Sequence, residues 1–174
     1  METRGVTVNK ESAKASLLVV PLLICLCVSC GVYSTTTQVA PHLKTVYVPT
    51  FENKTSEFYM PQMLTDGVIE KLMSESNLRV SSTEESDSVL RGTILAYRVE
   101  AMAYSGEGDV TSRRVRVLIE AEFVDQIKNK VLWKGERVER WGTYDSLNET
   151  ERDGAERAIE KLAEDIVTQS LQGW

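Results

Sequence analysis

The chain has 174 residues, of which 26 are acidic and 20 are basic, so its formal net charge is −6 at pH 7. This acidic balance argues against general nucleic-acid binding, because that activity needs a basic surface to displace the counterions of the phosphates. The chain contains no internal repeat and no low-complexity segment, so its function has to be sought in local motifs.

The first 29 residues are predicted to be a signal peptide that is removed from the mature protein. Residues 15–31 read ASLLVVPLLICLCVSCG, an uncharged apolar run that follows Arg4, Lys10 and Lys14. A basic start, an apolar middle and a small residue before the cleavage site are typical of secretory signals. A retained membrane helix is the weaker interpretation, because Pro21 interrupts the run and spanning a bilayer takes roughly 18–20 residues.

Cys30 is predicted to become a lipid-bearing N-terminus. Val28-Ser29-Cys30-Gly31 resembles the lipobox of bacterial lipoproteins, although Cys27 stands where that pattern prefers leucine. The alternative is an ordinary signal that ends in cysteine. Each buried acyl methylene contributes about 0.8 kcal/mol, so two or more acyl chains give stable anchoring. Cleavage before Cys30 leaves 145 residues, one histidine and no cysteine pair, which is too few ligands for a structural zinc site.

Residues 30–43 are predicted to be the lipidated N-terminus and a polar tether, and residues 44–174 a single domain. The domain opens with a β-branched strand at residues 45–48, and a polar, turn-rich stretch follows Pro49. A helix with Pro61 in its first turn is expected next. Apolar residues at three- and four-residue spacing give this helix one apolar face: Met60, Met63, Leu64, Val68 and Leu72.

Four more strands are predicted after this helix, at residues 78–82, 89–104, 114–123 and 131–141. In the strand at 114–123, apolar and charged residues alternate, which is typical of a sheet with one buried and one polar face. A final helix is expected after Asn148 as its N-cap, with an apolar stripe facing the sheet. The predicted fold is therefore an α+β two-layer sandwich, with two helices on a mixed, mainly antiparallel sheet of four to five strands in the order β-α-β-β-β-β-α.

Motifs for catalysis are absent from the sequence. His42 lies in the predicted tether and is interpreted as a surface histidine without a placed partner. No G-x-S-x-G nucleophile elbow occurs, and the Gly106-Glu107-Gly108 segment is interpreted as an acidic hairpin tip. The sequence predicts no cofactor, no metal site and no enzymatic activity.

Basic residues cluster after this hairpin tip at Arg113, Arg114 and Arg116, with Arg137 and Arg140 on the expected neighbouring strand. Guanidinium groups contact phosphates bidentately, so the cluster is a candidate site for a phosphorylated glycolipid head group. The alternative is that the arginines form cross-strand ion pairs. The acidic residues available for such pairs are Glu120, Glu122, Glu136 and Glu139.

Local strings along the mature chain resemble the LptE-type lipopolysaccharide-assembly lipoproteins. The matching strings are CGVYS at 30–34, VYVPTFENKT at 46–55, LTD at 64–66, SDSVLRGTI at 86–94 and RDGA at 152–155. The resemblance implies a lipoprotein at the inner leaflet of the outer membrane, facing the periplasm. It also implies that the protein plugs a β-barrel partner of LptD type, helps to assemble it, and assists insertion of lipopolysaccharide into the outer leaflet.

Two other functional classes remain open at this stage. The Pro-x-Phe-x-Asn-x-Thr segment also resembles the start of LpoB-type activators of peptidoglycan synthases, which are α/β domains on a lipid tether. A hydrolase is the third class, and the missing catalytic residues argue against it. The resemblance to the LptE type implies that basic residues near the strand-connecting loops contact lipopolysaccharide, for which Arg113, Arg114 and Arg116 are the candidates.

Overall fold

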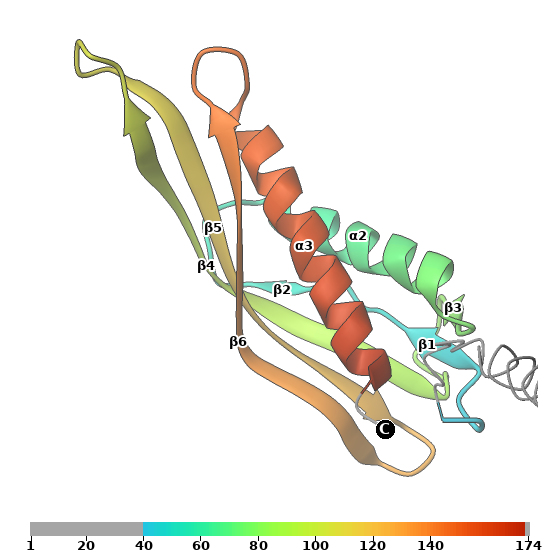
Figure 1. The fold of residues 1–174 in the computed structure, drawn as a ribbon. Helices are drawn as coiled ribbons and strands as arrows, with labels where there is room; N and C mark the ends of the chain where they lie inside the picture. Colours follow the sequence, from blue (N-terminus) through green and yellow to red (C-terminus); the bar gives the residue numbers. More distant parts are fainter. Residues whose placement is uncertain (1–39, 173–174) are drawn as a thin grey trace, which may run out of the picture. The chain divides into compact units, whose positions relative to one another are not determined.

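The structure is a computed structural model that describes residues 40–172. The predicted signal peptide, Cys30 and most of the predicted tether lie outside the described residues. No helix in the described part is long and apolar enough to cross a membrane. The elements in chain order are β1 (Thr45–Tyr47), β2 (Glu52–Asn53), α2 (Met60–Glu75), β3 (Arg79–Ser81), β4 (Ser88–Tyr104), β5 (Val110–Asp125), β6 (Lys130–Asp145) and α3 (Glu151–Gln172) (Figure 1).

The predicted α+β two-layer sandwich is confirmed, with α2 and α3 on one face of a mixed sheet (Figure 1). The strands lie in the order β3-β1-β4-β5-β6, and β2 pairs with β4 beside this path. The pairs that involve β1 and β2 are parallel, and β4, β5 and β6 form the predicted antiparallel meander. The sheet has six strands and not four to five, because the two residues of β2 pair with Thr93 and Ile94. A strand of two residues is too short to show any periodicity in the sequence.

The hydrophobic core lies between the sheet and the two helices. Alternate residues of β5 from Val115 to Phe123 are buried, and the intervening residues are on the opposite face. The apolar stripe of α3 covers this surface, since strand residues alternate between faces whereas helix residues recur every three to four positions. The stripe comprises Ala155, Ala158, Ile159, Leu162, Ala163, Ile166, Val167 and Leu171, all buried.

The N-cap of α3 differs from the prediction. Thr150, and not Asn148, is the N-cap residue that precedes the helix. Its backbone N–H and its hydroxyl both donate to Asp153 Oδ2 at 2.7 Å. The Asp153 backbone N–H contacts Thr150 Oγ1 at 3.4 Å, which completes a reciprocal capping arrangement. Asn148 instead donates its side-chain amide to Asp145 Oδ2 at 2.9 Å, in the turn that follows β6.

Two glycines, Gly142 and Gly154, set the close spacing of the layers, whereas Gly67 does not. A Cβ atom added to Gly142 of β6 would lie 2.1 Å from the carbonyl oxygen of Gly154 in α3. A Cβ at Gly154 would in turn lie 2.7 Å from the Tyr144 ring. In α2, a Cβ at Gly67 would make ordinary contacts with Ile159 and Ala163 of α3, at 3.5 and 3.6 Å. The N-terminal part of α3 therefore rests directly on the backbone of β6, without intervening side chains.

Packing against the core extends into the segment that the sequence assigned to the tether. Leu43 is buried and Ala40 packs against the core cluster. The interpretation of His42 as a histidine without a partner is wrong, because His42 Nε2 lies 2.6 Å from Asp125 Oδ2. Asp125 is fully buried at the end of β5, and its Oδ1 accepts the Lys128 backbone N–H at 2.9 Å. Burial opposes ionisation of Asp125, but the hydrogen bonds from His42 and Lys128 outweigh it and hold the pKa of this carboxyl below its usual range.

Candidate functional site

The three candidate arginines of β5 lie on two different faces of the sheet. Arg114 and Arg116 alternate with the buried Val115 and so belong to the outer face, away from the helices. Arg113 belongs to the helix-covered face, where its register partner on β6 is the buried Tyr144. The three arginines are close together in the sequence, but Arg113 is separated from the other two by the sheet.

A smaller set of arginines does come together on the outer face. Arg98 of β4 is the register partner of Arg116, and both line a hollow of about 90 Å³ together with Arg137 of β6. We call Arg98, Arg114, Arg116 and Arg137 the outer-face arginine cluster. The other residues that line the hollow are Ala96, Leu118 and Glu139. Arg98, Arg116 and Arg137, from three adjacent strands, thus meet at one hollow, and Arg114 lies two residues before Arg116 on the same face of the sheet.

The members of the outer-face arginine cluster differ in how far their charges are neutralised. Arg116 lies 2.7 Å from Glu139 Oε1 and 3.5 Å from Glu100 Oε1, so the cross-strand pairing considered for the sequence is correct at this position. Arg114 stacks on Trp141, with 5.2 Å between its Cζ and the ring centroid. Within the described residues, Arg98, Arg114 and Arg137 have no carboxylate oxygen within 4.0 Å of a guanidinium nitrogen. These three remain available to an anionic ligand.

Arg140, the other arginine considered on β6, does not belong to this surface. Its Nε lies 2.6 Å from Asp165 Oδ2 of α3, on the helix-covered face. The sequence clustering thus missed Arg98, which is far from the other arginines along the chain and becomes their neighbour only through the β4–β5 register.

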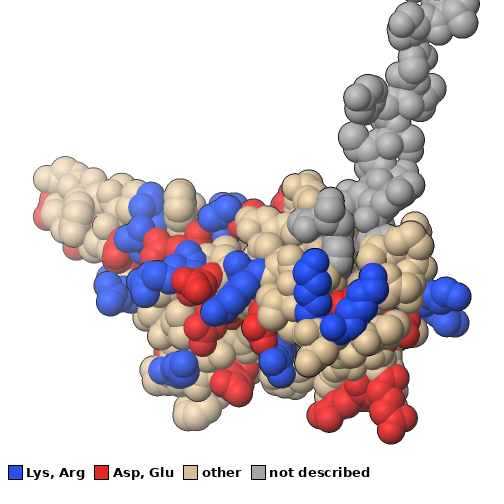
Figure 2. All heavy atoms as spheres, turned by 90° about the horizontal axis from the view of Figure 1, so that it is seen from below, with Lys and Arg blue, Asp and Glu red and all other residues tan. Residues whose placement is uncertain are grey.

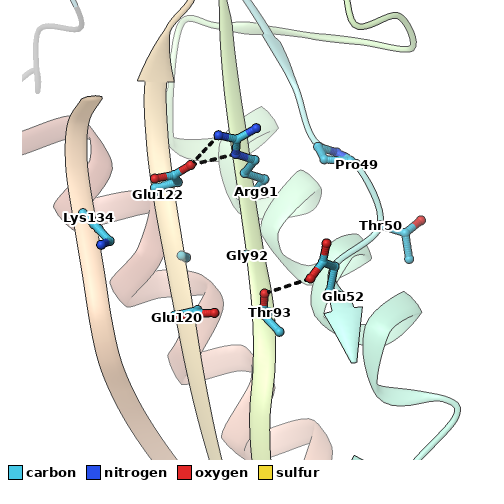
Figure 3. A pocket seen from close by; sticks show the side chains of 10 residues that line it. Pro49, Thr50, Glu52, Arg91, Gly92, Thr93, Glu120, Glu122 and Lys134 are labelled. Carbon is cyan, nitrogen blue, oxygen red and sulfur yellow. Dashed lines mark hydrogen bonds and ion pairs between the residues drawn. The ribbon is translucent and has the colours of Figure 1, made fainter. Parts of the chain in front are cut away.

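A second hollow on the outer face, of about 450 Å³, is lined by more acidic than basic residues (Figure 3). Arg91 contacts Glu122 Oε1 at 2.7 Å, and Thr93 Oγ1 lies 3.4 Å from Glu52 Oε2, as the dashed lines in Figure 3 mark. Its charged lining consists of two basic and three acidic residues: Arg91, Lys134, Glu52, Glu120 and Glu122. An excess of carboxylates makes this hollow a poorer phosphate site than the outer-face arginine cluster.

On the face that Figure 2 displays, basic and acidic side chains are largely interspersed. Figure 2 shows basic and acidic side chains side by side over the part of the domain it displays, and a projecting end that is mostly uncharged. Such a surface does not steer polyanions over long distances, so recognition depends on local contacts.

A polar network joins the N-terminal ends of α2 and α3 to β4. The Tyr97 hydroxyl donates to Glu151 Oε1 at 2.7 Å and lies 3.2 Å from the Tyr59 hydroxyl. The pKa of Tyr97 is raised well above its usual range, mainly by burial and to a lesser extent by these hydrogen bonds. A phenol with so high a pKa stays protonated, so Tyr97 acts as a hydrogen-bond donor that links the helix ends to β4.

The described residues bring no catalytic group together. The hydrogen bond of the His42 ring goes to Asp125, and no serine or threonine hydroxyl in residues 40–172 is hydrogen-bonded to it. The same residues contain no group of three His, Cys, Asp or Glu side chains arranged to hold a metal ion. The fold and this surface define a class of protein: an α+β two-layer domain whose polar sheet face is free of the covering helices.

The family follows from comparison with known sequences. The family model described as LptE, Lipopolysaccharide-assembly, matches residues 43–170, so the chain belongs to the LptE lipopolysaccharide-assembly family. This is a family of non-enzymatic lipoproteins of the cell envelope. No curated protein sequence matches the chain significantly. The comparisons give no support to the LpoB-type alternative.

Solved structures share the fold at low sequence identity. The hypothetical protein CT253 from Chlamydia trachomatis is 12% identical, with 74% of this chain and 96% of that chain covered and a TM-score of 0.53. The dodecamer of a PelC variant with a leucine-to-methionine substitution, from Paraburkholderia phytofirmans, is 17% identical, with coverages of 78% and 95% and a TM-score of 0.49. Lipoprotein GNA1162 from Neisseria meningitidis is 14% identical, with coverages of 72% and 96% and a TM-score of 0.43. The first of these likenesses shows the fold alone, and the other two add nothing to it.

Proposed function

We propose that this chain is an outer-membrane lipoprotein, acylated at Cys30 and facing the periplasm, that plugs and helps to assemble an LptD-type β-barrel. In that position it assists insertion of lipopolysaccharide into the outer leaflet. The observation that carries the proposal is the family match over residues 43–170, which spans nearly the whole described domain. The protein acts by contact and not by turnover, and needs no cofactor other than its covalent lipid.

The partner is tested by affinity purification of the full chain from detergent-solubilised membranes. We expect an outer-membrane β-barrel to co-elute. A penicillin-binding protein in its place would favour the LpoB-type alternative, and turnover of a substrate without any partner would favour a hydrolase. The mass of the mature N-terminus tests acylation, and Cys30→Ser is expected to release the protein from the membrane.

The outer-face arginine cluster is proposed to hold the phosphates of lipopolysaccharide. Arg114 is the central residue, because Trp141 holds its guanidinium in place and no carboxylate oxygen of the described residues lies within 4.0 Å of its nitrogens. A planar guanidinium that is already immobilised loses little entropy when it binds a phosphate. A charge-assisted hydrogen bond contributes about 1.5–3 kcal/mol, so Arg114→Ala is expected to weaken binding about tenfold or more.

The chain offers a matched control for this experiment. Arg113→Ala removes the same charge from the adjacent residue, but on the helix-covered face, so it is expected to leave lipopolysaccharide binding unchanged. Equal losses for Arg113→Ala and Arg114→Ala would mean that net charge, and not the outer-face arginine cluster, governs binding. No loss for Arg114→Ala combined with Arg98→Ala would remove the cluster from the proposal.

A further inference from the structure

The turn between β5 and β6 carries apolar residues where turns normally carry polar ones. Ile127 lies within this turn with 59% of its surface exposed, and Val131 follows at the start of β6 with 49% exposed. Turns favour Gly, Asn, Asp and Ser, as in the Ser-Gly-Glu-Gly-Asp turn at the opposite end of β5. We call residues 126–131 the basal turn.

The basal turn is held in one conformation by three independent features. Asp125 Oδ1 accepts the Lys128 backbone N–H, and the Gln126 backbone N–H donates to the Asp87 carbonyl oxygen at 2.9 Å. Asn129 adopts a left-handed conformation with φ of 49°, which asparagine tolerates better than most residues. Exposure of Ile127 is therefore built into the turn.

Two lysines lie within the basal turn, and a third, Lys44, belongs to the segment that shares Asp87 as a hydrogen-bond acceptor with Gln126. Lys44, Lys128 and Lys130 are exposed, and in the described chain none has a carboxylate oxygen within 4.0 Å of its Nζ. Glu84 and Glu85 lie in the adjoining loop, so the local charge is mixed and not strongly basic. Exposed aliphatic side chains beside free lysines match the boundary between acyl chains and anionic head groups.

The path of the chain brings the basal turn close to the proposed anchor. His42 is attached to Asp125, the residue that precedes the basal turn, and twelve residue steps separate it from Cys30. A fully extended segment of this length spans about 40 Å at most. The 16 residues of β5 span about 50 Å, so the opposite end of the sheet lies farther from His42 than Cys30 can lie.

We propose that the basal turn contacts the surface of the lipid leaflet that holds the acyl chains of Cys30. Ile127 and Val131 enter the head-group region, and the neighbouring lysines face anionic head groups. In the acylated protein without its barrel partner, the domain then stands with the basal turn at the membrane and the β4–β5 hairpin directed away from the lipid surface. This inference rests on the proposed acylation of Cys30.

The test uses the mature lipoprotein in vesicles of phosphatidylethanolamine and phosphatidylglycerol, without any barrel protein. Ile127→Cys and, as a matched control, Leu147→Cys are each labelled with the environment-sensitive fluorophore NBD. Leu147 is also an exposed aliphatic residue, with 77% of its surface exposed, but it lies in the β6–α3 loop at the other end of the sheet. The readouts are the emission wavelength and the quenching by doxyl-labelled lipids.

We expect a blue shift and a loss of emission at residue 127, with neither at residue 147. Equal emission and equal quenching at both positions, in protein whose N-terminal mass shows acylation, would overturn the inference and leave the proposed anchoring intact. A blue shift at 127 that requires added barrel protein would overturn it in favour of a protein contact. An unmodified Cys30 would overturn the anchoring, and the inference with it.

Discussion

The closest contact between the two layers gives the sharpest stability prediction. In Gly142→Ala, the new methyl group would lie 2.1 Å from the Gly154 carbonyl oxygen, 2.7 Å from Arg157 Cβ and 2.9 Å from the Ala158 backbone nitrogen. A carbon and a carbonyl oxygen normally approach to about 3.3–3.6 Å. The N-terminal part of α3 must therefore move by about 1 Å or more, and the obstacle is helix backbone and not a flexible side chain.

The size of the effect follows from this geometry. Inserting a methyl group into a packed core costs about 1–3 kcal/mol, and the rigid obstacle places Gly142→Ala at or above the upper end, about 3 kcal/mol. Unfolding entropy of about 2.1 cal/mol/K per residue gives about 0.28 kcal/mol/K for a domain of about 130 residues. We therefore expect Tm to fall by about 11 °C.

Thermal unfolding of the mature chain, followed by circular dichroism, measures this shift. Gly106→Ala is the control, because no heavy atom lies within 4 Å of its added Cβ, and its Tm is expected to stay within about 2 °C of the parent. Gly67→Ala meets only ordinary contacts and gains helix propensity of about 1 kcal/mol, so it is expected to leave Tm unchanged or to raise it. A Tm for Gly142→Ala equal to that of Gly106→Ala would refute the close packing of α3 on β6.

Three further predictions concern the core and the buried carboxylate. Phe123→Ala empties a fully buried site and is expected to cost about 3–5 kcal/mol in urea unfolding; a cost below about 1 kcal/mol would contradict its place in the core. His42→Ala deprives the buried Asp125 of one partner and should cost about 1–3 kcal/mol at pH 7, whereas His42→Gln, which can still donate a hydrogen bond, should cost less. The folded-state pKa values of Asp125, Asp87 and Asp145 are lowered, so their stabilisation is present above about pH 4 and is lost as pH falls further; urea midpoints that are equal at pH 5 and pH 3 would contradict this.

Much of the fold could be predicted because its long elements carry strong patterns. The alternation in β5 and the stripe of α3 each extend over many residues. The apolar face of β5 and the apolar face of α3 are both buried, as expected. The two-residue β2 could not be predicted in the same way, because it depends on tertiary pairing with β4. The N-cap of α3 could not be predicted either, because it depends on which of several polar residues meets the helix end. Asn148 and Thr150 are both good N-cap residues, and only the contact between Thr150 and Asp153 distinguishes them.

The candidate site was less accessible to sequence reasoning. Proximity along the chain grouped Arg113 with Arg114 and Arg116, although a strand separates adjacent residues onto opposite faces. The predicted strand begins at residue 114, whereas β5 begins at Val110, and the alternation continued back to Arg113 places this residue on the buried side. The contribution of Arg98 depends on register across β4 and β5, which no local pattern specifies.

The strict alternation of β5 also limits how homologous chains can vary in length. Inserting or deleting one residue between Arg113 and Phe123 would reverse the orientation of every side chain beyond that point, exposing valines and isoleucine and turning arginine and glutamate inwards. Gains and losses of residues should therefore be confined to the two hairpin loops, while β5 keeps a constant number of residues even where its amino acids change.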